Sequence, residues 1–570
     1  MLGNDTVKRA LTAFAKAAAM PFYRRRLEKF ERMLARGHAV QRATLFEKLR
    51  RCADSRFGKD HGFSRIQTID DYRRAVPIAQ YEYAAPYIRE VSEGKIESLF
   101  PADEKILAFG CTSGTSGQPK LNPVTRTWLR EYRRSWEIWG TKAILAHSDM
   151  IGTRILQLTG PADLDRTPSG LSVGMVSAIA VRHQSRLLRA FYATPFGVSD
   201  ISDPAAKYYS ILRLSMVQDV GFLIAITPAN LIRLAETGNE FRESLIRDIH
   251  DGTLRSDFQL PSGFREAVAP RIRVKRPDLA RKFEQVVERT GKLYPKDYWR
   301  LHLATCWLGG TIGYQSRILP QYYGNVALRD LGLVSTEGRH TTPLEDFRPE
   351  GVLAVDGNYY EFIPVEEMGT PNPTVLECHE LEPGGEYFLI MTTSSGLYRY
   401  DIGDVVRCVG YMGQAPLLEF LHKDDSCVDM EGEKISGHQI AQAVETAAHE
   451  LALNVGCVTA VPVRSDGERP HYALLIEESS ISDKASAVEF LKIVDRELVK
   501  QNVMYAGKRN DLYIDPPSLV RLRNGAWSEF VADELNRRGT AESQYKHPAL
   551  LPDAKWLDRF EPVDTVRVSK

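Results

Sequence analysis

The chain has 570 residues, more than one ordinary domain holds and enough for a large core. Hydrophobic residues make up 43% and charged residues 26%, so the composition predicts a soluble globular protein and excludes a disordered one. Lysine plus arginine equals aspartate plus glutamate at 74 each, which argues against a surface that binds nucleic acid in general.

The first predicted elements are helices over residues 7–53, a region rich in arginine, leucine and alanine. The segment VKRALTAFAKAAAMPFYRRR superficially resembles a targeting peptide. Because Lys16 interrupts its apolar part and helical segments continue through Leu49, the pattern favours an ordinary amphipathic helix. No run of residues is long and apolar enough to span a membrane, so we expect no membrane partner.

The most informative stretch is the decapeptide CTSGTSGQPK, from Cys111 to Lys120. An apolar strand candidate, Ile106–Phe109, precedes it, and a helix with an apolar face follows. The residues of that face are Trp128, Tyr132, Trp136, Trp139 and Ala143. A strand, a glycine-rich hydroxylated loop and a helix form a phosphate-binding arrangement. Glycines permit close backbone approach, and hydroxyl and N–H groups donate to phosphate oxygens.

The same loop has a second interpretation as a polar surface turn, since serine, glycine and threonine dominate turns. A turn does not need this density of hydroxyl groups followed by Pro119 and Lys120, so the pattern favours nucleotide binding. The spacing G-x-x-x-x-G-K-[ST] is absent, which excludes a Walker loop.

Residues 126–300 mix helical stretches with apolar strand candidates, a texture typical of α/β folds. The helical stretches include Pro204–Val217 and Asn230–Ile249, and Phe222–Thr227 is a strand candidate. Between 351 and 411 the pattern changes to short strands. There GVLAVDGNYYEFIP places an Asp-Gly turn between two apolar runs, which predicts a β-hairpin.

A smaller unit follows a rise in charge density around His422–Asp425. We predict a helix near 437–452, strands in VGCVTAVPV and HYALLIEE, and a helix near 484–501. This order indicates a small α+β domain of ferredoxin-like character. With the boundary near 424–430, we assign residues 1–425 to an N-terminal domain and residues 426–570 to a C-terminal domain.

The seven cysteines are scattered and form no close pair with zinc spacing, so we interpret them as reduced thiols of a cytoplasmic protein. They are Cys52, Cys111, Cys306, Cys378, Cys408, Cys427 and Cys457.

Two further polar clusters interrupt apolar surroundings. They are VSTEG at Val334–Gly338 and YRYDIGDVV at Tyr398–Val406. Taken singly, Glu337 and Asp404 fit solvated loop carboxylates equally well. In order after the loop, they provide what an adenylating enzyme needs: a carboxylate for Mg²⁺ and a carboxylate that accepts hydrogen bonds from the ribose hydroxyls.

These motifs resemble those of the Gretchen Hagen family of acyl acid–amido synthetases, within the superfamily of acyl-CoA synthetases, luciferases and peptide-synthetase adenylation domains. The resemblance covers nearly the whole chain. Its segments are FSRIQTIDDYRRAVPIAQYEYAAPYIREVSEGK, CTSGTSGQPKLNPVT, TCWLGGTIGYQSRILPQYYG, STEG, YYEFIPV, LYRYDIGDVV, APLLEFLHKDDSCVDMEGEK and QYKHPALL. The resemblance implies an α/β fold, with a large adenylate-forming N-terminal domain that contains a β-barrel section. It also implies a small mobile α+β C-terminal domain, rotating about 424–430.

The resemblance also implies a role for each site residue. Those assigned to ATP are Thr112, Ser113, Gly114, Thr115, Ser116, Gly117, Lys120, Ser335, Thr336, Glu337, Tyr400 and Asp404. Glu337 would also bind the metal. The catalytic lysines would be Lys120, Lys423 and Lys546, and Lys434 aligns with a lysine near the hinge. For Lys423, Lys434 and Lys546 a solvated surface charge is the alternative.

One position departs from the family pattern. The second motif usually begins with an aromatic residue that lies against adenine, and here that position is Leu333. Leucine supplies an apolar wall without a ring face, so Tyr359 or Tyr360 is an alternative adenine partner.

The implied reaction uses ATP and Mg²⁺ with two substrates, a small carboxylic acid and an amino acid. The acid is first adenylated and its acyl group then passes to the amine, which releases pyrophosphate and then AMP. An acyl-CoA ligase would share the first step, and a non-catalytic adenylate-binding scaffold would share the fold. Intact Lys120, Glu337 and Asp404 argue against the scaffold. The sequence names neither the acid nor the acceptor and leaves the oligomeric state open.

Overall fold

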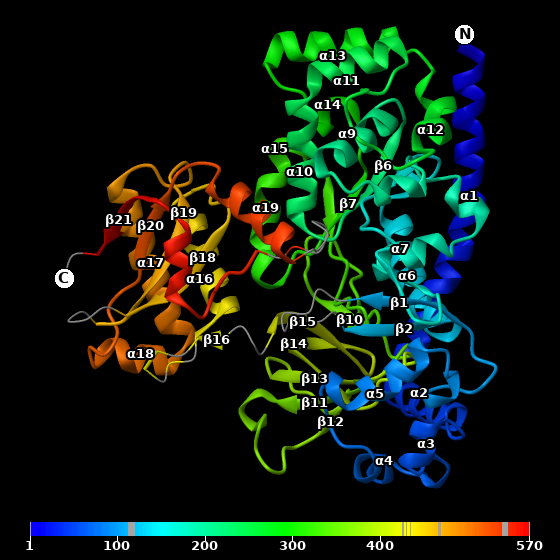
Figure 1. Ribbon diagram of the computed structural model, residues 1–570, viewed down its shortest axis with the longest axis vertical. Helices are drawn as coiled ribbons and strands as arrows, with labels where there is room; N and C mark the ends of the chain where they lie inside the picture. Colours follow the sequence, from blue (N-terminus) through cyan, green and yellow to red (C-terminus); the bar gives the residue numbers. More distant parts are fainter. Residues whose placement is uncertain are drawn as a thin grey trace. The chain divides into compact units, whose positions relative to one another are not determined.

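The computed structural model describes residues 2–111, 120–423, 427–428, 430–431, 433, 435–464, 469–538, 545 and 547–568. The chain divides into two compact units, whose elements are labelled in Figure 1. The first unit comprises Met1–Trp307, Leu319–Ile402 and Val406–Glu419. The second comprises Leu308–Ile318, Gly403–Val405 and Phe420–Lys570. The domain boundary between residues 425 and 426 stays a prediction.

The chain begins with two helices, α1 (Leu2–Leu34) and α2 (Gly37–Arg51), where the sequence predicts helices. Phe30 of α1 and both Leu45 and Leu49 of α2 are buried in one hydrophobic core of the first unit. Over the residues that the structure covers, no helix combines the length and the apolar character needed to cross a membrane.

Three shorter helices precede the first strand. They are α3 (Arg56–Asp60), α4 (Ile69–Ala75) and α5 (Tyr81–Ser92). A capping box starts α4, because Thr68 Oγ1 accepts from Asp71 N and the Asp71 carboxylate accepts from Thr68 N. The buried residues Ala84, Ile88 and Val91 form the inner face of α5. This packing fixes the helix whose first residue is Tyr81.

The first sheet has the order β2–β1–β5–β4. Its strands are β1 (Ile106–Cys111), β2 (Leu121–Thr125), β4 (Asp165–Arg166) and β5 (Ser172–Gly174). The predicted strand at Ile106–Phe109 is confirmed by β1. The predicted apolar helix is α6 (Arg126–Ala146), which buries Trp128 and Trp139.

The expectation that the glycine-rich loop leads directly into this helix is wrong. Strand β2 intervenes and pairs antiparallel with β1, so that Cys111 lies opposite Leu121. Pro123 obscures this strand in the sequence, because proline cannot donate to a sheet ladder. It is tolerated here because β2 lies at the end of the sheet order.

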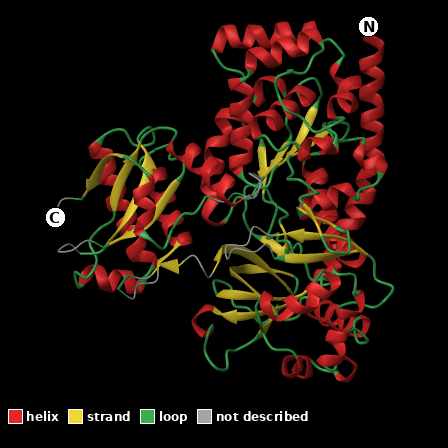
Figure 2. Cartoon of the chain, viewed as in Figure 1, coloured by secondary structure: helices red, strands yellow, loops and turns green. Residues whose placement is uncertain are grey.

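The second sheet, β3–β6–β7–β8, is parallel throughout. Its strands are β3 (Arg154–Gln157), β6 (Val220–Ile224), β7 (Leu303–Thr305) and β8 (Ala327–Arg329). Parallel strands need crossover connections, and Figure 2 shows helices packed around this sheet. The helices that lie between β3 and β8 in the sequence are α7 (Val176–Arg182), α8 (Arg186–Arg189), α9 (Pro204–Ser215), α10 (Pro228–Glu240), α11 (Arg242–Asp251), α12 (Phe264–Ile272), α13 (Pro277–Thr290), α14 (Pro295–Tyr298) and α15 (Leu319–Tyr323). The α/β texture predicted for residues 126–300 is confirmed.

A seven-stranded sheet, β12–β11–β13–β14–β15–β10–β9, includes the region between 351 and 411 that was predicted to form short strands. Its strands are β9 (Thr341–Thr342), β10 (Gly351–Leu353), β11 (Tyr359–Pro364), β12 (Leu376–Glu377), β13 (Glu386–Thr392), β14 (Tyr400–Met412) and β15 (Ala415–Lys423). The predicted hairpin within 351–364 is wrong. Strand β10 pairs with β15 and β9, whereas β11 pairs with β12 and β13.

A side chain of α2 explains how the chain passes from β10 to β11 without a hairpin. Gln41 Nε2 donates to the carbonyl oxygens of Val355 (2.7 Å) and Asn358 (2.6 Å), and its Oε1 accepts from Tyr360 N (2.9 Å). Gln41 is only 1% exposed, and buried backbone groups need such partners. The side-chain amide therefore supplies hydrogen bonds that a hairpin ladder would otherwise make.

The second unit contains a four-stranded sheet, β18–β19–β20–β21. Its elements are β16 (Cys427–Val428), β17 (Ile435–Ser436), α16 (Gly437–Glu450), β18 (Val458–Val463), β19 (His471–Glu477), α17 (Lys484–Gln501), α18 (Val503–Asn510), β20 (Ser518–Leu522), α19 (Ala526–Arg538) and β21 (Pro562–Arg567). The two predicted helices and the two predicted strands of this region are confirmed by α16, α17, β18 and β19.

Both faces of this sheet are buried. On β19, Tyr472 and Leu474 join a core with residues of α16 and α17. The alternate residues Ala473 and Leu475 join a second core with Trp527 of α19. Successive side chains of a strand point to opposite faces, so the three helices cover the two sides of one sheet.

Candidate active site

The loop that the sequence singles out lies outside the described residues. It carries Thr112, Ser113, Gly114, Thr115, Ser116 and Gly117, whose assignment to ATP stays a prediction. Its two flanks are described. Cys111 ends β1 and Leu121 begins β2, and the two lie opposite each other in the antiparallel ladder. The fold therefore brings the two ends of the loop side by side, at the neighbouring ends of β1 and β2.

Lys120 closes the loop directly before β2 and is half-buried. Its Nζ lies 5.5 Å from the centre of the Tyr81 ring, within the range of a cation–π interaction. The Tyr81 hydroxyl donates to Leu121 O (2.8 Å) and accepts from Leu121 N (3.0 Å). The first residue of α5 thus fixes the backbone that carries the lysine.

The negative charge of Glu337 affects the pKa of Tyr81. Burial raises the pKa of Tyr81 to about 12, and the Glu337 carboxylate acts in the same direction, although the hydrogen bond to Leu121 opposes both. An influence of this kind requires the two groups to share one electrostatic environment. The second motif is therefore near the flank of the first.

The second motif forms a tight turn between Val334 and Arg339, which pair as an isolated bridge. Ser335 N donates to Gly338 O (2.9 Å), and Glu337 N donates to Ser335 Oγ (3.1 Å). Ser335 Oγ is also 2.8 Å from His340 Nε2. The serine predicted to bind ATP is thus used to shape the turn that presents Glu337.

Three contacts join this turn to the first motif. Asn122 Nδ2 on β2 donates to Thr336 O (2.8 Å), and Trp128 Nε1 on α6 donates to Glu337 O (2.7 Å). A Cβ atom at Gly110 on β1 would lie 2.7 Å from Thr336 Cγ2, so only glycine permits this approach. The structure therefore brings the predicted residues Lys120, Thr336 and Glu337 into one region of the first unit.

A buried arginine, Arg339, stabilises the end of the same turn. The Arg339 guanidinium lies 4.6 Å from the centre of a Trp136 ring and donates to Leu331 O (2.5 Å). Burial lowers the pKa of Arg339. Glu337 itself is only 5% exposed, and a buried carboxylate needs cationic or hydrogen-bonding compensation.

The third motif lies on β14. Tyr400 is buried, and its neighbours bond to Ala79: Ala79 N donates to Arg399 O (3.2 Å) and Asp401 N donates to Ala79 O (2.9 Å). Asp404, further along the strand, is also buried. Lys423 ends the neighbouring strand β15, and its Nζ lies 2.8 Å from Asp404 Oδ1. The predicted ribose carboxylate and the basic residue predicted to follow it therefore form an ion pair.

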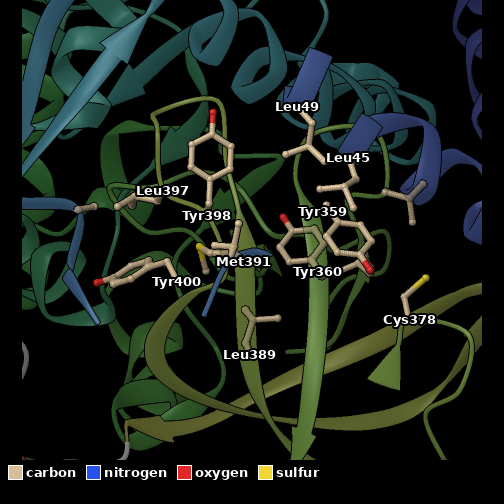
Figure 3. Close-up of a cluster of buried hydrophobic side chains, with 14 of the residues drawn as sticks. Leu45, Leu49, Tyr359, Tyr360, Cys378, Leu389, Met391, Leu397, Tyr398 and Tyr400 are labelled. Atoms are coloured by element: carbon tan, nitrogen blue, oxygen red, sulfur yellow. The ribbon is translucent and has the colours of Figure 1, made fainter. Parts of the chain in front are cut away.

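The adenine partner stays a prediction at Leu333, which is half-buried and packs against the large core. The two tyrosines suggested as alternatives are fully buried. Figure 3 shows Tyr359 and Tyr360 packed beside Leu45 and Leu49 of α2. Neither ring is therefore available as an exposed face for a base. Two predicted lysines, Lys434 and Lys546, lie outside the described residues.

Three residues whose supporting role the sequence did not predict hold the predicted site residues in place. Asn122 and Trp128 hold the second motif, and Tyr81 holds Lys120. Asn122 carried a signal, because a polar side chain between apolar neighbours in a strand is buried and needs a partner. Trp128 gave no such signal, since a tryptophan on an apolar helix face is typical of a core.

Sequence profiles of one family cover most of the chain. The GH3 family N-terminal domain matches residues 26–328, the GH3 family central domain matches residues 351–423, and the GH3 family C-terminal domain matches residues 438–555. This chain belongs to the GH3 family. The family predicted from the motifs is thereby confirmed.

The GH3 relatives match over nearly their full length. The chain is 26% identical to the probable indole-3-acetic acid-amido synthetase GH3.1 of Oryza sativa subsp. japonica, over 95% of this chain and 91% of that protein. It is 22% identical to the jasmonoyl–L-amino acid synthetase JAR4 of Nicotiana attenuata, over 92% of each protein.

Solved structures share the fold. The AtGH3.15 acyl acid amido synthetase in complex with 2,4-DB superposes with a TM-score of 0.84 at 21% identity, over 96% of this chain and 98% of that one. A 2-hydroxyisobutyryl-CoA ligase in the postadenylation state gives a TM-score of 0.51 at 14% identity, over 95% and 91%. The predicted α/β fold with N-terminal and C-terminal domains is confirmed.

Proposed function

We propose that this GH3-family chain is an ATP-dependent acyl acid–amido synthetase, a ligase that forms an amide through an acyl-adenylate. The observation that carries the proposal is the attachment of the Glu337 turn to the strand pair that flanks the glycine-rich loop. Asn122 and Trp128 make this attachment. Because this strand pair carries the two ends of the loop and Lys120, the attachment supports a role for the buried Glu337 carboxylate in the same site. The amido synthetases among the relatives support the same conclusion.

In the first step, a carboxylate oxygen of the acid bonds to the α-phosphorus of ATP. The bond from that phosphorus to the bridging oxygen breaks, and pyrophosphate leaves. In the second step, the amine nitrogen of an amino acid bonds to the acyl carbon. The bond from that carbon to the AMP oxygen breaks, AMP leaves, and the nitrogen loses a proton. No covalent bond to the protein is needed.

The chain's own residues would hold and neutralise ATP during these steps. Lys120 would place a positive charge against the phosphates, and Asp404 would accept hydrogen bonds from the ribose hydroxyls. Lys423 would keep Asp404 in position through their ion pair.

Glu337 fits a role as ligand of Mg²⁺. Its backbone N–H donates to Ser335 Oγ and its carbonyl accepts from Trp128 Nε1. Its buried carboxylate supplies the kind of oxygen ligand that Mg²⁺ prefers. When bound, Mg²⁺ neutralises charge on the phosphate oxygens. The proposed cytoplasmic location rests on the cysteines. Those described, Cys52, Cys111, Cys306, Cys378, Cys408 and Cys457, are all free thiols.

The test is acid-dependent exchange of pyrophosphate into ATP, followed by mass spectrometry of the products. The first acids to supply are indole-3-acetic acid, the acid of the jasmonoyl group and 2,4-DB, together with small aromatic and aliphatic acids. Each is offered with pooled amino acids or with CoA. Amino-acid-dependent AMP release with the matching amide mass supports the proposal. A thioester that forms only with CoA, without amide, would make the chain an acyl-CoA ligase. Tight ATP binding without exchange for any acid would favour a non-catalytic scaffold.

A further inference from the structure

A group of metal-ligating side chains lies in the first unit and includes no residue assigned to ATP. Among the described residues, His38, Glu377 and His379 each offer one ligand atom, and these atoms all lie within 4.8 Å of one another. Glu377 is buried, His38 is half-buried and His379 is exposed. One side of the group is therefore buried and the other side is open to solvent.

The three side chains come from elements that the fold holds rigidly. His38 lies in the first turn of α2, and its backbone N donates to Gln414 Oε1 (3.4 Å). Glu377 ends β12, and His379 follows in a turn. That turn closes on itself, because Glu377 N donates to Glu380 Oε2 (2.7 Å) and Glu380 N donates to Glu377 O (3.0 Å). A helix start and a strand end thus present their ligands to each other.

The two imidazoles lie close together. The rings of His38 and His379 stack with centroids 3.8 Å apart and planes at 27°. His38 Nε2 lies 3.5 Å from Glu377 Oε2, which is longer than an ordinary hydrogen bond. In the part of the chain with coordinates, this buried nitrogen makes no hydrogen bond. A buried nitrogen of this kind calls for a partner, and a metal ion supplies one.

Arg42, one turn after His38 on α2, opposes a cation at this place. Its Nη2 donates to Glu377 Oε2 (2.7 Å) and its Nε donates to Oε1 (3.3 Å). The Glu377 carboxylate has about four lone-pair positions in all, and Arg42 occupies two of them, so two remain for a metal ion.

We propose that His38, Glu377 and His379 form a binding site for a transition-metal dication such as Zn²⁺. Two imidazole nitrogens and one carboxylate oxygen suit Zn²⁺, Co²⁺, Ni²⁺ and Cu²⁺. Mg²⁺ prefers oxygen ligands alone, so the site differs in kind from the one proposed at Glu337. Water completes the coordination on the side of the exposed His379. The bound ion ties the start of α2 to the end of β12.

The experiment uses the full chain, stripped of metal with a chelator and then dialysed. ZnCl₂ is titrated by calorimetry, and CoCl₂ is titrated by visible absorption, which reports nitrogen and oxygen ligands directly. We expect one equivalent of each ion to bind. His379→Ala should weaken Zn²⁺ binding by about 10-fold or more and change the Co²⁺ spectrum, because a ligand is lost. His379 is exposed, so this variant should keep the fold.

The matched control is His250→Ala. His250 is an exposed histidine whose Nδ1 lies 2.8 Å from Asp251 Oδ1, and it belongs to no group of three ligands in the described residues. Its replacement should leave the affinity unchanged. Arg42→Gln gives a test of opposite sign: removal of the competing cation should strengthen Zn²⁺ binding several-fold. The proposal is overturned if no equivalent of Zn²⁺ binds, or if His379→Ala binds Zn²⁺ as tightly as His250→Ala.

Discussion

Trp128 Nε1 donates a 2.7 Å hydrogen bond to the main-chain oxygen of Glu337, which is 209 residues away in the sequence. Trp128 lies in the first turn of α6, where the hydroxyl of Thr125 caps the helix by accepting from Trp128 N (2.9 Å). One helix start therefore fixes both the end of the first motif and the turn of the second. The position of the Glu337 carboxylate depends on this bond.

We predict that Trp128→Phe lowers pyrophosphate exchange, because the ring packing remains while the Glu337 carbonyl loses its donor. The stability should fall by about 1–3 kcal/mol, the usual cost of an unsatisfied buried group. Trp139→Phe is the control, since Trp139 Nε1 makes the same kind of bond to Asp330 O (2.8 Å) on the same helix. Both variants should unfold at similarly reduced urea concentrations. Equal losses of exchange in the two would argue against a specific role for Trp128.

We predict that Glu337→Gln abolishes adenylate formation and leaves the fold intact. Loss of a carboxylate that stabilises the transition state should cost about 2–4 kcal/mol. Glu345→Gln is a suitable control, because Glu345 is an exposed carboxylate paired with Lys142 at 2.9 Å. Exchange rates measured across a range of Mg²⁺ concentrations distinguish the two. Near-normal exchange in Glu337→Gln would remove this residue from the site.

A ribose contact at Asp404 can be tested with nucleotide analogues. We expect the wild-type chain to use 2′-deoxy- and 3′-deoxy-ATP less well than ATP, because a charged acceptor of a hydrogen bond contributes about 1.5–3 kcal/mol. In Asp404→Asn this discrimination should shrink, whatever the remaining activity. Glu419 is a carboxylate on β15 that pairs with Arg407, and Glu419→Gln should discriminate between ATP and the deoxy analogues like wild type. An Asp404→Asn enzyme that still rejects the deoxy analogues would show that the ribose binds elsewhere.

We predict a large loss of stability in Glu361→Gln. Glu361 is 1% exposed and accepts from Arg73 Nε (2.9 Å) and from Arg399 Nε (2.8 Å). Removal of its charge leaves the buried Arg399 guanidinium and the half-buried Arg73 guanidinium uncompensated, which costs about 3–5 kcal/mol. Glu386→Gln removes one of the two carboxylates paired with Arg407 and should cost less than about 1 kcal/mol. Equilibrium unfolding in urea compares the two, and similar midpoints would contradict the expectation.

The second unit should lose stability in mild acid through His547. Burial lowers the pKa of His547 to about 3, from an ordinary value of 6.5. Thr459 Oγ1 donates to Pro548 O (2.7 Å), so it accepts from the neutral ring at Nε2 (2.8 Å). The unfolded chain binds a proton below pH 6.5 and the folded chain does not. Stability is therefore fully present above pH 6.5 and falls as the pH falls toward 3.

At pH 5 the expected loss is about 2 kcal/mol relative to pH 7.5. Thermal unfolding of His547→Gln against wild type over this range measures it, since glutamine does not titrate. The pH dependence of the variant should be shallower. His250→Gln alters an exposed histidine and should retain the wild-type slope. Parallel curves for wild type and His547→Gln would exclude this histidine as the cause.

Local patterns predicted the elements that local interactions form. The helices α6, α16 and α17 show apolar residues at helical spacing, and β1 and β19 are apolar runs. Residues 351–364 show the limit of this approach. An Asp-Gly turn looks the same in the sequence whether the next strand returns beside the first or crosses to another part of the sheet. The deciding contact is Gln41, more than 300 residues earlier, which no local pattern contains.

The candidate active site, like the fold, was predictable only where local sequence patterns reveal it. Glu337, Asp404 and Lys120 lie in motifs whose residue types suit ATP, and the structure places Glu337 near the flank of the loop. The side chains that hold the turn come from other segments, so only the fold reveals them. The pair of Asp404 and Lys423 is intermediate. Asp404 lies in the segment predicted to form short strands, but no strand was predicted at Lys423, so the pairing of β14 with β15 could not be derived from the sequence.

The antiparallel pairing of Cys111 with Leu121 has a consequence for how the loop can vary. Its ends are fixed by the sheet at the spacing of paired strands, about 4.5–5.5 Å between Cα atoms. A change in the number of residues between them alters only the entropy of a closed segment, by about 0.6 kcal/mol for each doubling of length. Insertions between Cys111 and Leu121 should therefore leave the stability of the fold almost unchanged. The ligand specificity of this loop can then diverge without destabilising the sheet that carries it.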